Sequence, residues 1–433
     1  MKRFFLLAAA ALMLASAPAL ADERPDADKA SSSGELRQLR ERIEKLEQQM
    51  SEKEVLNELG HKLHPIHSIY GLRISGGLTT TAQGSTHAKT GPQRGAAALS
   101  ADLAFESHVG ENGRAAAVFD VQMGAGMRNL PPFATQPNAN PTGPNNDLES
   151  FNNDNVHLAQ IYYEHNVNKK LTFTVGKLDP TAYFDTNAYA NTERSQFLAN
   201  LFVNNPAIEF GGTADFYGPG IRATCKPNDS LGITVGAFEG KGNFNDTFNS
   251  PFFMAEVDLK LNPAGKEGKY RFYYWNRQGR PDELSAANPA DARLSRAANQ
   301  GAGISFDQSI SSLLGVWLRA GTQREKVAQF GRFFGGGLNF SGPFASRPND
   351  NAGFGYGADF IGKDYKEFKA GSSADFKPAA EHYLEAYYNI AIDGAKDNTG
   401  FYVTPDVQYV INPGGDREQN KLFIYGMRLQ AYF

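Results

Sequence analysis

Residues 422–433, LFIYGMRLQAYF, contain the pattern that decides the predicted fold. The odd-numbered positions are mostly large and apolar: Phe423, Tyr425, Met427, Leu429, Ala431 and Phe433. The even-numbered positions include Gly426, Arg428 and Gln430. A period of two puts apolar side chains on one face of a β-strand and polar side chains on the other. The segment therefore predicts a strand with one apolar face and one polar face.

The sequence ends on an aromatic residue, with no polar tail after this strand. A terminal strand in a soluble protein tends to fray. A strand in a bilayer must have all its backbone groups hydrogen-bonded, because the hydrocarbon region has no water to bond them. We therefore expect an all-β fold, a transmembrane antiparallel β-barrel, preceded by a short N-terminal α-helical coiled coil.

The composition agrees with a barrel and argues against a helical membrane protein. Hydrophobic residues make up 41% of the 433 residues and the mean hydropathy is −0.45. Beyond residue 21, no apolar run reaches the roughly 18 residues of a spanning helix. Barrel strands alternate lipid-facing and polar residues, so an ordinary average is expected. The single cysteine, Cys225, excludes an intrachain disulfide and a cysteine-based metal site.

The net charge argues against a nucleic-acid partner. It is −4 for the whole chain, and becomes −6 (−4 − 2) once Lys2 and Arg3 are removed. A mildly negative net charge disfavours association with a phosphate backbone.

Three segments precede the predicted barrel, which comprises residues 69–433. Residues 1–21 have a basic start, an apolar stretch and a small-x-small end, and predict a cleaved signal peptide and hence export. Residues 22–34 form a polar, serine-rich linker. Residues 35–63 are predicted to form a periplasmic helix.

That helix has an apolar seam with alternating spacings of three and four: Leu36, Leu39, Ile43, Leu46 and Met50. This spacing is typical of a coiled coil. A helix this short is marginal alone, so we expect it to associate with copies of itself. The alternative is an amphipathic helix that lies on the barrel or plugs it.

A histidine cluster, His61, His64 and His67, follows the helix. Several subunits could gather such residues around a metal. Pro65 interrupts the helix between them, however, and no carboxylate or cysteine joins them. We expect a hinge between coil and barrel, no metal site and no cofactor.

From residue 69 onward the sequence reads as strands and turns. The predicted strands are 69–80, 96–109, 113–126, 155–166, 170–178, 216–227, 231–240, 252–262, 267–277, 299–307, 312–321, 331–340, 353–363, 380–391, 401–411 and 422–433. They number about 16, an even number as bacterial barrels require. Tight turns, as at residues 111–113 and 168–169, alternate with long links at 127–154, 179–215, 278–298 and 341–352. Short periplasmic turns and long outer loops are the usual barrel pattern.

Charged residues share one face of several strands, as in 252–262 and 401–411. On a lipid-facing surface each would cost about 2–4 kcal/mol at the bilayer centre, so this face must point into the lumen. A soluble β-sandwich would expose the same charges to solvent, but it accounts poorly for so many strands. The candidate pore-lining residues are Glu256, Asp258, Lys260, Arg271, Asp406, Gln408 and Arg428.

Two segments resemble a known family. They are GKLDPTAYFDTNAYANTERSQFLANLFVNNPAIEF (176–210), followed by YGPG (217–220), and YVTPDVQYVINPGGDREQNKLFIYGMRLQAYF (402–433). Both are similar to the carbohydrate-selective porins of the OprB type, and the resemblance extends from about residue 69 to the end. It implies a sixteen-stranded outer-membrane barrel, often trimeric, that passes sugars down their gradient. A coiled coil is not part of that family's core, which leaves other cargo open.

The first of these segments leaves a strand and enters a long loop that could fold inward. Its amides and carboxylates can bond sugar hydroxyls and its aromatic residues can stack on sugar faces; the same groups would suit a loop that only packs against the barrel wall. The candidate inward-loop residues are Asp185, Asn187, Asn191, Glu193, Gln196, Asn204 and Asn205.

The favoured function is a passive outer-membrane porin for small hydrophilic solutes, carbohydrates in particular, assembled as a homo-oligomer with a trimer favoured. The alternatives are a ligand-specific, siderophore-type uptake barrel and a structural barrel that sheathes an envelope complex. An enzyme is not expected, because the histidines of the barrel are few and scattered and no catalytic constellation is visible: His87, His108, His157, His165 and His382.

Overall fold

The computed structural model describes residues 65–69, 71–86, 95–124, 127, 155–210, 217–240, 244, 247, 250–278, 298–372, 375–396 and 399–433. The predicted signal peptide, linker and coiled coil lie outside these residues, as do His61 and His64. In the part of the chain described, no helix is both long and apolar enough to cross a membrane.

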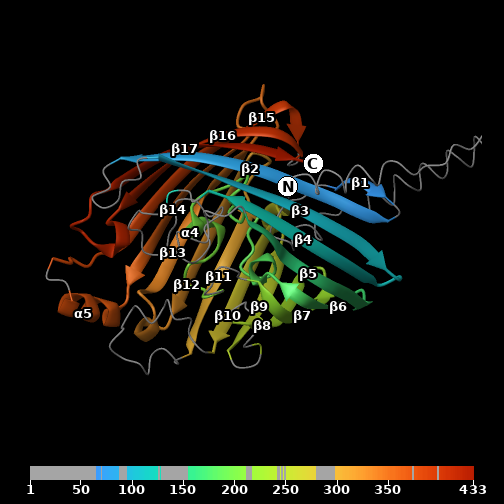
Figure 1. The fold of residues 1–433 in the computed structure, drawn as a ribbon, viewed down its shortest axis with the longest axis horizontal. Helices are drawn as coiled ribbons and strands as arrows, with labels where there is room; N and C mark the ends of the chain where they lie inside the picture. The colour runs from blue at the N-terminus through green and yellow to red at the C-terminus, as the bar shows by residue number, and fades with distance from the viewer. Residues whose placement is uncertain are drawn as a thin grey trace, which may run out of the picture. The chain divides into compact units, whose positions relative to one another are not determined.

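Consecutive antiparallel strands form a closed barrel (Figure 1). Sixteen strands make up its wall: β2 (Leu72–Thr86), β3 (Gly95–Val109), β4 (Gly113–Met123), β5 (Asn155–Asn168), β6 (Leu171–Leu178), β7 (Gly218–Asn228), β8 (Leu231–Glu239), β9 (Pro251–Leu261), β10 (Gly268–Arg277), β11 (Asn299–Ser309), β12 (Leu314–Gln323), β13 (Phe330–Ser341), β14 (Asn351–Ile361), β15 (Glu381–Lys396), β16 (Thr399–Ile411) and β17 (Leu422–Tyr432). The predicted strand number is confirmed.

The last strand closes the barrel on the first. β17 pairs antiparallel with β2, from Phe423 opposite Thr86 to Tyr432 opposite Gly77. Beyond this register, the backbones of Phe433 and Gly76 exchange two hydrogen bonds of 3.0 Å. The terminal aromatic residue therefore belongs to the wall.

One strand was missed by the sequence analysis. β1 (Pro65–Ile69) pairs with the first residues of β2, Leu72–Ser75, which lie past the end of β17. The predicted first strand, 69–80, was therefore wrong at its start. The backbone reverses at Gly71, whose φ of +82° is accessible to glycine at little cost.

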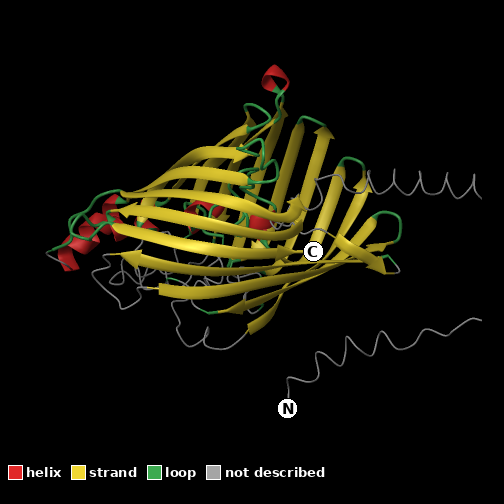
Figure 2. Cartoon of the chain, turned by 90° about the horizontal axis from the view of Figure 1, so that it is seen from above, coloured by secondary structure: helices red, strands yellow, loops and turns green. Residues whose placement is uncertain are grey.

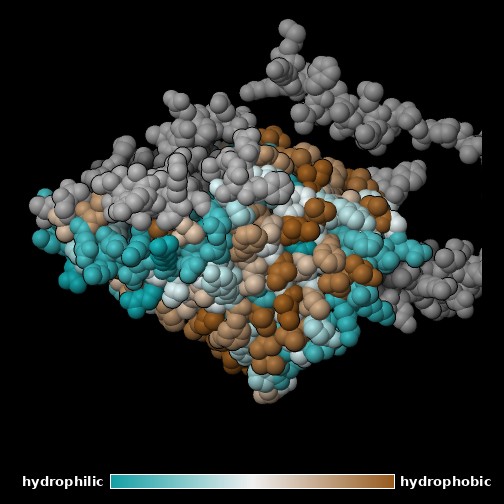
Figure 3. Space-filling model, turned by 90° about the horizontal axis from the view of Figure 1, so that it is seen from below, coloured by the Kyte–Doolittle hydropathy of each residue, from teal (hydrophilic) through white to brown (hydrophobic). Residues whose placement is uncertain are grey.

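The two faces of the strands are as predicted. In β17 the odd positions 423, 425, 427 and 429 are 42–49% exposed, whereas Arg428 and Gln430 are fully buried. Figure 3 shows apolar side chains gathered across the outer wall, with hydrophilic side chains toward both ends. This band is the surface that a bilayer would cover.

The connections differ at the two ends of the barrel. At the turn end, short links such as 110–112, 169–170 and 229–230 join the strands. Residues 342–350 also lie at this end, between β13 and β14, so the expectation that long links fall only at the other end was wrong here. The opposite, loop end holds α5 (Lys363–Ser372), a helix that no sequence pattern predicted.

Candidate functional site: the barrel interior and the inward loop

Residues 179–210, hereafter the inward loop, are the described part of the connection that follows β6, and they lie in the barrel interior. Figure 2 shows loop segments and short helical turns inside the ring of strands. The loop contains the one-turn helix α4 (Asn200–Val203). Its apolar side chains are fully buried: Ala182, Phe184, Ala190, Phe197, Leu198, Ala199, Leu201 and Phe202. A loop of this length in a compact fold is commonly functional.

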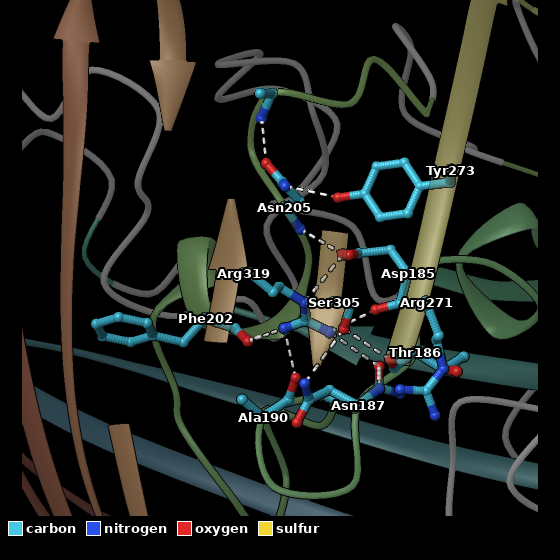
Figure 4. A network of polar contacts seen from close by, with 12 residues as sticks. Asp185, Thr186, Asn187, Ala190, Phe202, Asn205, Arg271, Tyr273, Ser305 and Arg319 are labelled. Atoms are coloured by element: carbon cyan, nitrogen blue, oxygen red, sulfur yellow. Dashed lines mark hydrogen bonds and ion pairs between the residues drawn. The ribbon is translucent and has the colours of Figure 1, made fainter. Parts of the chain in front are cut away.

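Arg319 on β12 is the hub that holds the loop (Figure 4). Its Nε lies 3.1 Å from Asp185 Oδ2, and both side chains are fully buried. Its two Nη atoms donate to the carbonyl oxygens of Asp185 (2.6 Å), Phe202 (2.5 Å) and Ala190 and, at 3.3 Å, to Asn191 Oδ1. One guanidinium thus joins loop segments that are far apart in sequence. Asp185 has a φ of 58°, a strained value for a non-glycine residue that these contacts maintain.

Loop amides add bonds to the neighbouring strands, as Figure 4 shows. The backbone N–H of Asn205 donates to Asp185 Oδ2 at 2.7 Å, and its side-chain amide donates to Tyr273 on β10 at 2.6 Å. Asn187 donates to Ser305 on β11 at 3.2 Å. Burial raises the pKa of Asp185, and the nearby Arg319 opposes that rise. Asp185 and Arg319 form a buried ion pair. Loss of either side chain would leave the other charge buried without its partner.

Two wall carboxylates accept hydrogen bonds from loop backbone amides. Glu256 on β9 accepts from Asp185 N at 2.8 Å. Glu385 on β15 accepts from Leu198 N and, at 2.9 Å, from Ala199 N. A carboxylate that bonds backbone N–H groups forms strong charge-assisted hydrogen bonds. These two residues fix the loop from different walls of the barrel.

An aromatic cluster packs the middle of the loop against β12 and β14. The ring of Phe197 lies 5.1 Å from that of Phe202 and 5.4 Å from that of Trp317. Beneath them the wall has Gly355 and Gly357, where an added Cβ would come within 2.9 Å of Phe197 and 2.6 Å of Leu201. Glycine is needed at these two positions because the loop approaches the strand so closely.

The far end of the loop reaches the opposite wall. Arg194 forms an ion pair with Asp102 on β3 and donates to Ser100 at 3.1 Å. Arg428 on β17 donates to the carbonyl oxygen of Glu193 at 2.7 Å. The inward loop therefore extends from the β9–β12 wall to β3 and β17 and divides the interior.

The predicted pore-lining residues all lie on the inward faces of their strands. Five are almost fully buried: Glu256, Arg271, Asp406, Gln408 and Arg428. Arg271 lies 2.6 Å from Asp307 and 3.3 Å from Asp258. The side chains of Asp258 and Lys260 keep 36% and 40% exposure. The seven predicted residues thus comprise five buried wall residues and two residues in contact with water, Asp258 and Lys260. That they line the pore stays a prediction.

The predicted inward-loop residues all fall within one folded loop. Asp185, Asn187, Gln196 and Asn205 are buried, and Asn191, Glu193 and Asn204 are partly exposed. Among the described residues, the side chain of Gln196 bonds within the loop: it donates to Ala188 O at 2.8 Å and accepts from Asn191 N at 2.7 Å. Asn204 ends α4. Part of this set therefore shapes the loop rather than facing the interior.

Several residues that organise the site were missed. Arg319 and Glu385 are the main ones, together with the wall network of Glu106, Arg114, Glu164 and Arg222. The alternation within the predicted strands 312–321 and 380–391 places Arg319 and Glu385 on the inward face. The sequence could therefore have predicted that both side chains point into the barrel. Their bonds to the loop could not be read from the strands alone. Among the described residues, no group of three or more His, Cys, Asp or Glu could hold a metal ion.

A family model described as carbohydrate-selective porin, OprB family, matches residues 77–433. The chain belongs to this family. The match includes the inward loop and every strand from β3 to β17. The chain is accordingly an outer-membrane porin for small solutes.

Solved structures show the same fold at low sequence identity. The high-pH structure of Pseudomonas putida OprB is 16% identical, with a TM-score of 0.68 over 84% of this chain and 94% of that chain. The outer membrane channel DcaP of Acinetobacter baumannii is 12% identical, with a TM-score of 0.51 over 86% of this chain and 100% of that chain. An uncharacterized protein of Aquifex aeolicus (strain VF5) is 28% identical over 122 residues, 28% of this chain and 34% of that relative. The chain thus matches about a third of that curated relative's length.

Proposed function

We propose that carbohydrates diffuse passively through the barrel, past the inward loop, without any chemical step. The observation that carries this proposal is the position of the loop, which is fixed to opposite walls and narrows the interior. Its partly exposed polar side chains, Asn191, Glu193 and Asn204, are of the kinds that bond sugar hydroxyls. In such a channel, the width and the charge of the lining decide which solutes pass. Membership of the carbohydrate-selective family supports sugars as the cargo.

The candidate residues have two proposed roles in this path. The buried wall groups, such as Glu256 and Arg428, hold the loop in place and thereby set the width of the channel. The groups with water contact, Asp258 and Lys260, line the part of the path beneath the loop. Passive selectivity then depends on both sets, because a loop that shifts changes the lining as well as the width.

We also propose that the chain forms a homo-oligomer, with a trimer favoured, through the predicted coiled coil at residues 35–63 in the periplasm. The heptad spacing of that segment supports the proposal.

Conductance of the purified protein in a planar bilayer, with sugars titrated in, tests the proposed function. We expect steady ohmic steps that a sugar blocks in a concentration-dependent way. Steps without block would leave a general porin and remove the carbohydrate cargo. A folded barrel that gives no steps would instead favour a ligand-specific uptake barrel or a sheath for an envelope complex.

A further inference from the structure

The outward face of strands β12, β13 and β14 differs between the two ends of the barrel. Toward the turn end, the outward side chains of these three strands are apolar: Leu314, Val316, Leu338, Phe340, Ala352 and Phe354. At the loop end, the outward residues Thr322, Arg332 and Phe360 lie side by side in the strand register. This part of the wall therefore carries an outward-facing charge at its loop end and none at its turn end.

Arg332 lies just beyond the exposed apolar surface of the wall. On the same outward face, Phe334 is 42% exposed and Phe360 is 39% exposed. The guanidinium of Arg332 lies over the ring of Phe360, 5.8 Å from its centre. Within the described part of the chain, no carboxylate pairs with Arg332. A cation–π contact leaves the in-plane N–H donors of a guanidinium free to bind an anion.

Further basic residues lie next to this arginine in the chain or follow the strand beside it. Arg324 and Lys326 are exposed in the link from β12 to β13, and Lys363 is exposed at the start of α5, which follows β14. Figure 1 shows α5 beyond the loop end of the wall. Residues 324–332 and 361–369 together contain six basic and three acidic residues, a net charge of +3.

The acidic residues of these segments do not neutralise the exposed basic ones. Glu325 accepts a hydrogen bond from the backbone N–H of Lys363 at 3.0 Å, and so serves the start of α5. Glu367 lies 3.7 Å from the Lys363 ammonium, but their side chains are 66% and 80% exposed. An ion pair this exposed contributes little. The surface formed by Arg324, Lys326, Arg332 and Lys363, hereafter the rim patch, is therefore positively charged.

The position of the rim patch indicates what it meets. Long loops lie on the outer side of bacterial barrels and short turns on the periplasmic side. The rim patch, at the loop end and just beyond the apolar band, thus lies at the level of the headgroups of the outer leaflet. Basic residues at this level attract anionic headgroups, each raising the affinity roughly fivefold.

We propose that the rim patch binds the phosphate groups of lipid A, the anionic glycolipid of the outer leaflet. The acyl chains of the same molecule lie along Phe334 and Phe360, so one lipid contacts both the charged and the apolar part of this surface. Arginine suits this role because its planar fork can bond two oxygens of one phosphate. The proposal does not depend on the cargo of the channel.

Native mass spectrometry of the full-length protein, stripped of lipid in detergent and titrated with diphosphoryl lipid A, tests this proposal. Arg332→Gln should weaken the binding of lipid A roughly fivefold, and adding Arg324→Gln should weaken it further. Monophosphoryl lipid A should bind the wild type more weakly than the diphosphoryl form. In phosphatidylcholine bilayers without lipid A, Arg332→Gln should leave the conductance unchanged, which shows that the barrel is intact.

The matched control is Lys169→Gln, which removes an exposed positive charge at the turn end of the barrel. It should bind lipid A as the wild type does. Equal affinity of the wild type and the double variant, or an equal loss in Lys169→Gln, would overturn the assigned site.

Two measurements on the wild type alone do not depend on how any variant folds. Raising KCl from about 50 mM to about 500 mM should weaken the binding of lipid A, because salt screens exposed charges. Binding that salt does not change would show that apolar contacts alone hold the lipid. An excess of inorganic phosphate should leave lipid A bound, since free phosphate lacks acyl chains. Displacement by inorganic phosphate would instead indicate a site for a small anion and overturn the assignment to a lipid.

Discussion

At the residue scale, Arg319 illustrates how one buried charge can organise a channel. Its guanidinium has five donor groups in a planar fork, and the loop supplies acceptors in matching directions: three carbonyl oxygens, an amide oxygen and a carboxylate. A lysine would offer a single point of charge and could not bridge these positions. The hub is therefore specific to arginine.

Replacing Arg319 by methionine should release the inward loop. The substitution leaves the Asp185 carboxylate buried without its partner, at a cost of about 3–5 kcal/mol. We expect a lower thermal unfolding midpoint by circular dichroism, and larger, noisier single-channel conductance. The matched control is Arg332→Met, since Arg332 lies on the exposed face of β13 and should leave both properties unchanged. Unchanged conductance in a folded Arg319 variant would show that the loop does not need this hub.

The charge of Glu193 should make selectivity depend on pH. As the pH falls through about 7 the group binds a proton, so the ratio of cation to anion permeability should decrease between about pH 8 and pH 5. Because the folded pKa lies above the ordinary value, ionisation costs stability as the pH rises through this window, and acidification restores it. Reversal potentials measured across this range should follow one titration in the wild type. In Glu193→Gln the component near pH 7 should disappear, whereas Glu111→Gln, a change at an exposed turn, should retain it.

At the element scale, the inward loop and β14 fit together because the strand lacks side chains where the loop is bulky. Gly355→Val should push Phe197 away, since even a Cβ would lie 2.9 Å from its ring. We expect faster proteolysis within residues 179–210 and altered conductance, with the barrel still formed. Gly95→Val is the control, because the nearest atom there, Gln83 O, lies 3.5 Å from the new Cβ. If both variants resist protease equally, the loop tolerates the larger residue and the close approach is not essential.

The sequence predicted the strands better than the loop between them. Alternation is a local property of one strand. The faces on which Phe423 and Arg428 lie can therefore be predicted without knowing which strands pair with theirs. The inward loop has no such period: its path is set by contacts such as those of Arg319 and Glu385, which lie more than a hundred residues away in the chain. β1 was missed for a related reason. A five-residue segment that begins with a proline resembles a linker. It forms a strand because the first residues of β2 have backbone groups that β17 does not pair.

At the scale of the whole molecule, the N-terminal segment tests the proposed assembly. A chain lacking residues 22–63 should still insert as a barrel, because none of the described wall contacts involves that segment. We expect light scattering in detergent to show an oligomer for the full chain and a monomer for the truncated one. Replacing Leu39 and Leu46 with aspartate should have the same effect without shortening the chain. An oligomer that survives both changes would place the subunit contact on the barrel instead.

The seam between β2 and β17 has a consequence for how the protein is made. β17 is the last of the described wall strands along the chain, and Phe433 beyond it is hydrogen-bonded into that seam. A chain interrupted before β17 would keep the other fifteen wall strands but leave β2 and β16 with unpaired edges, which a bilayer does not tolerate. Stable insertion of the barrel therefore requires a chain that was synthesised through β17.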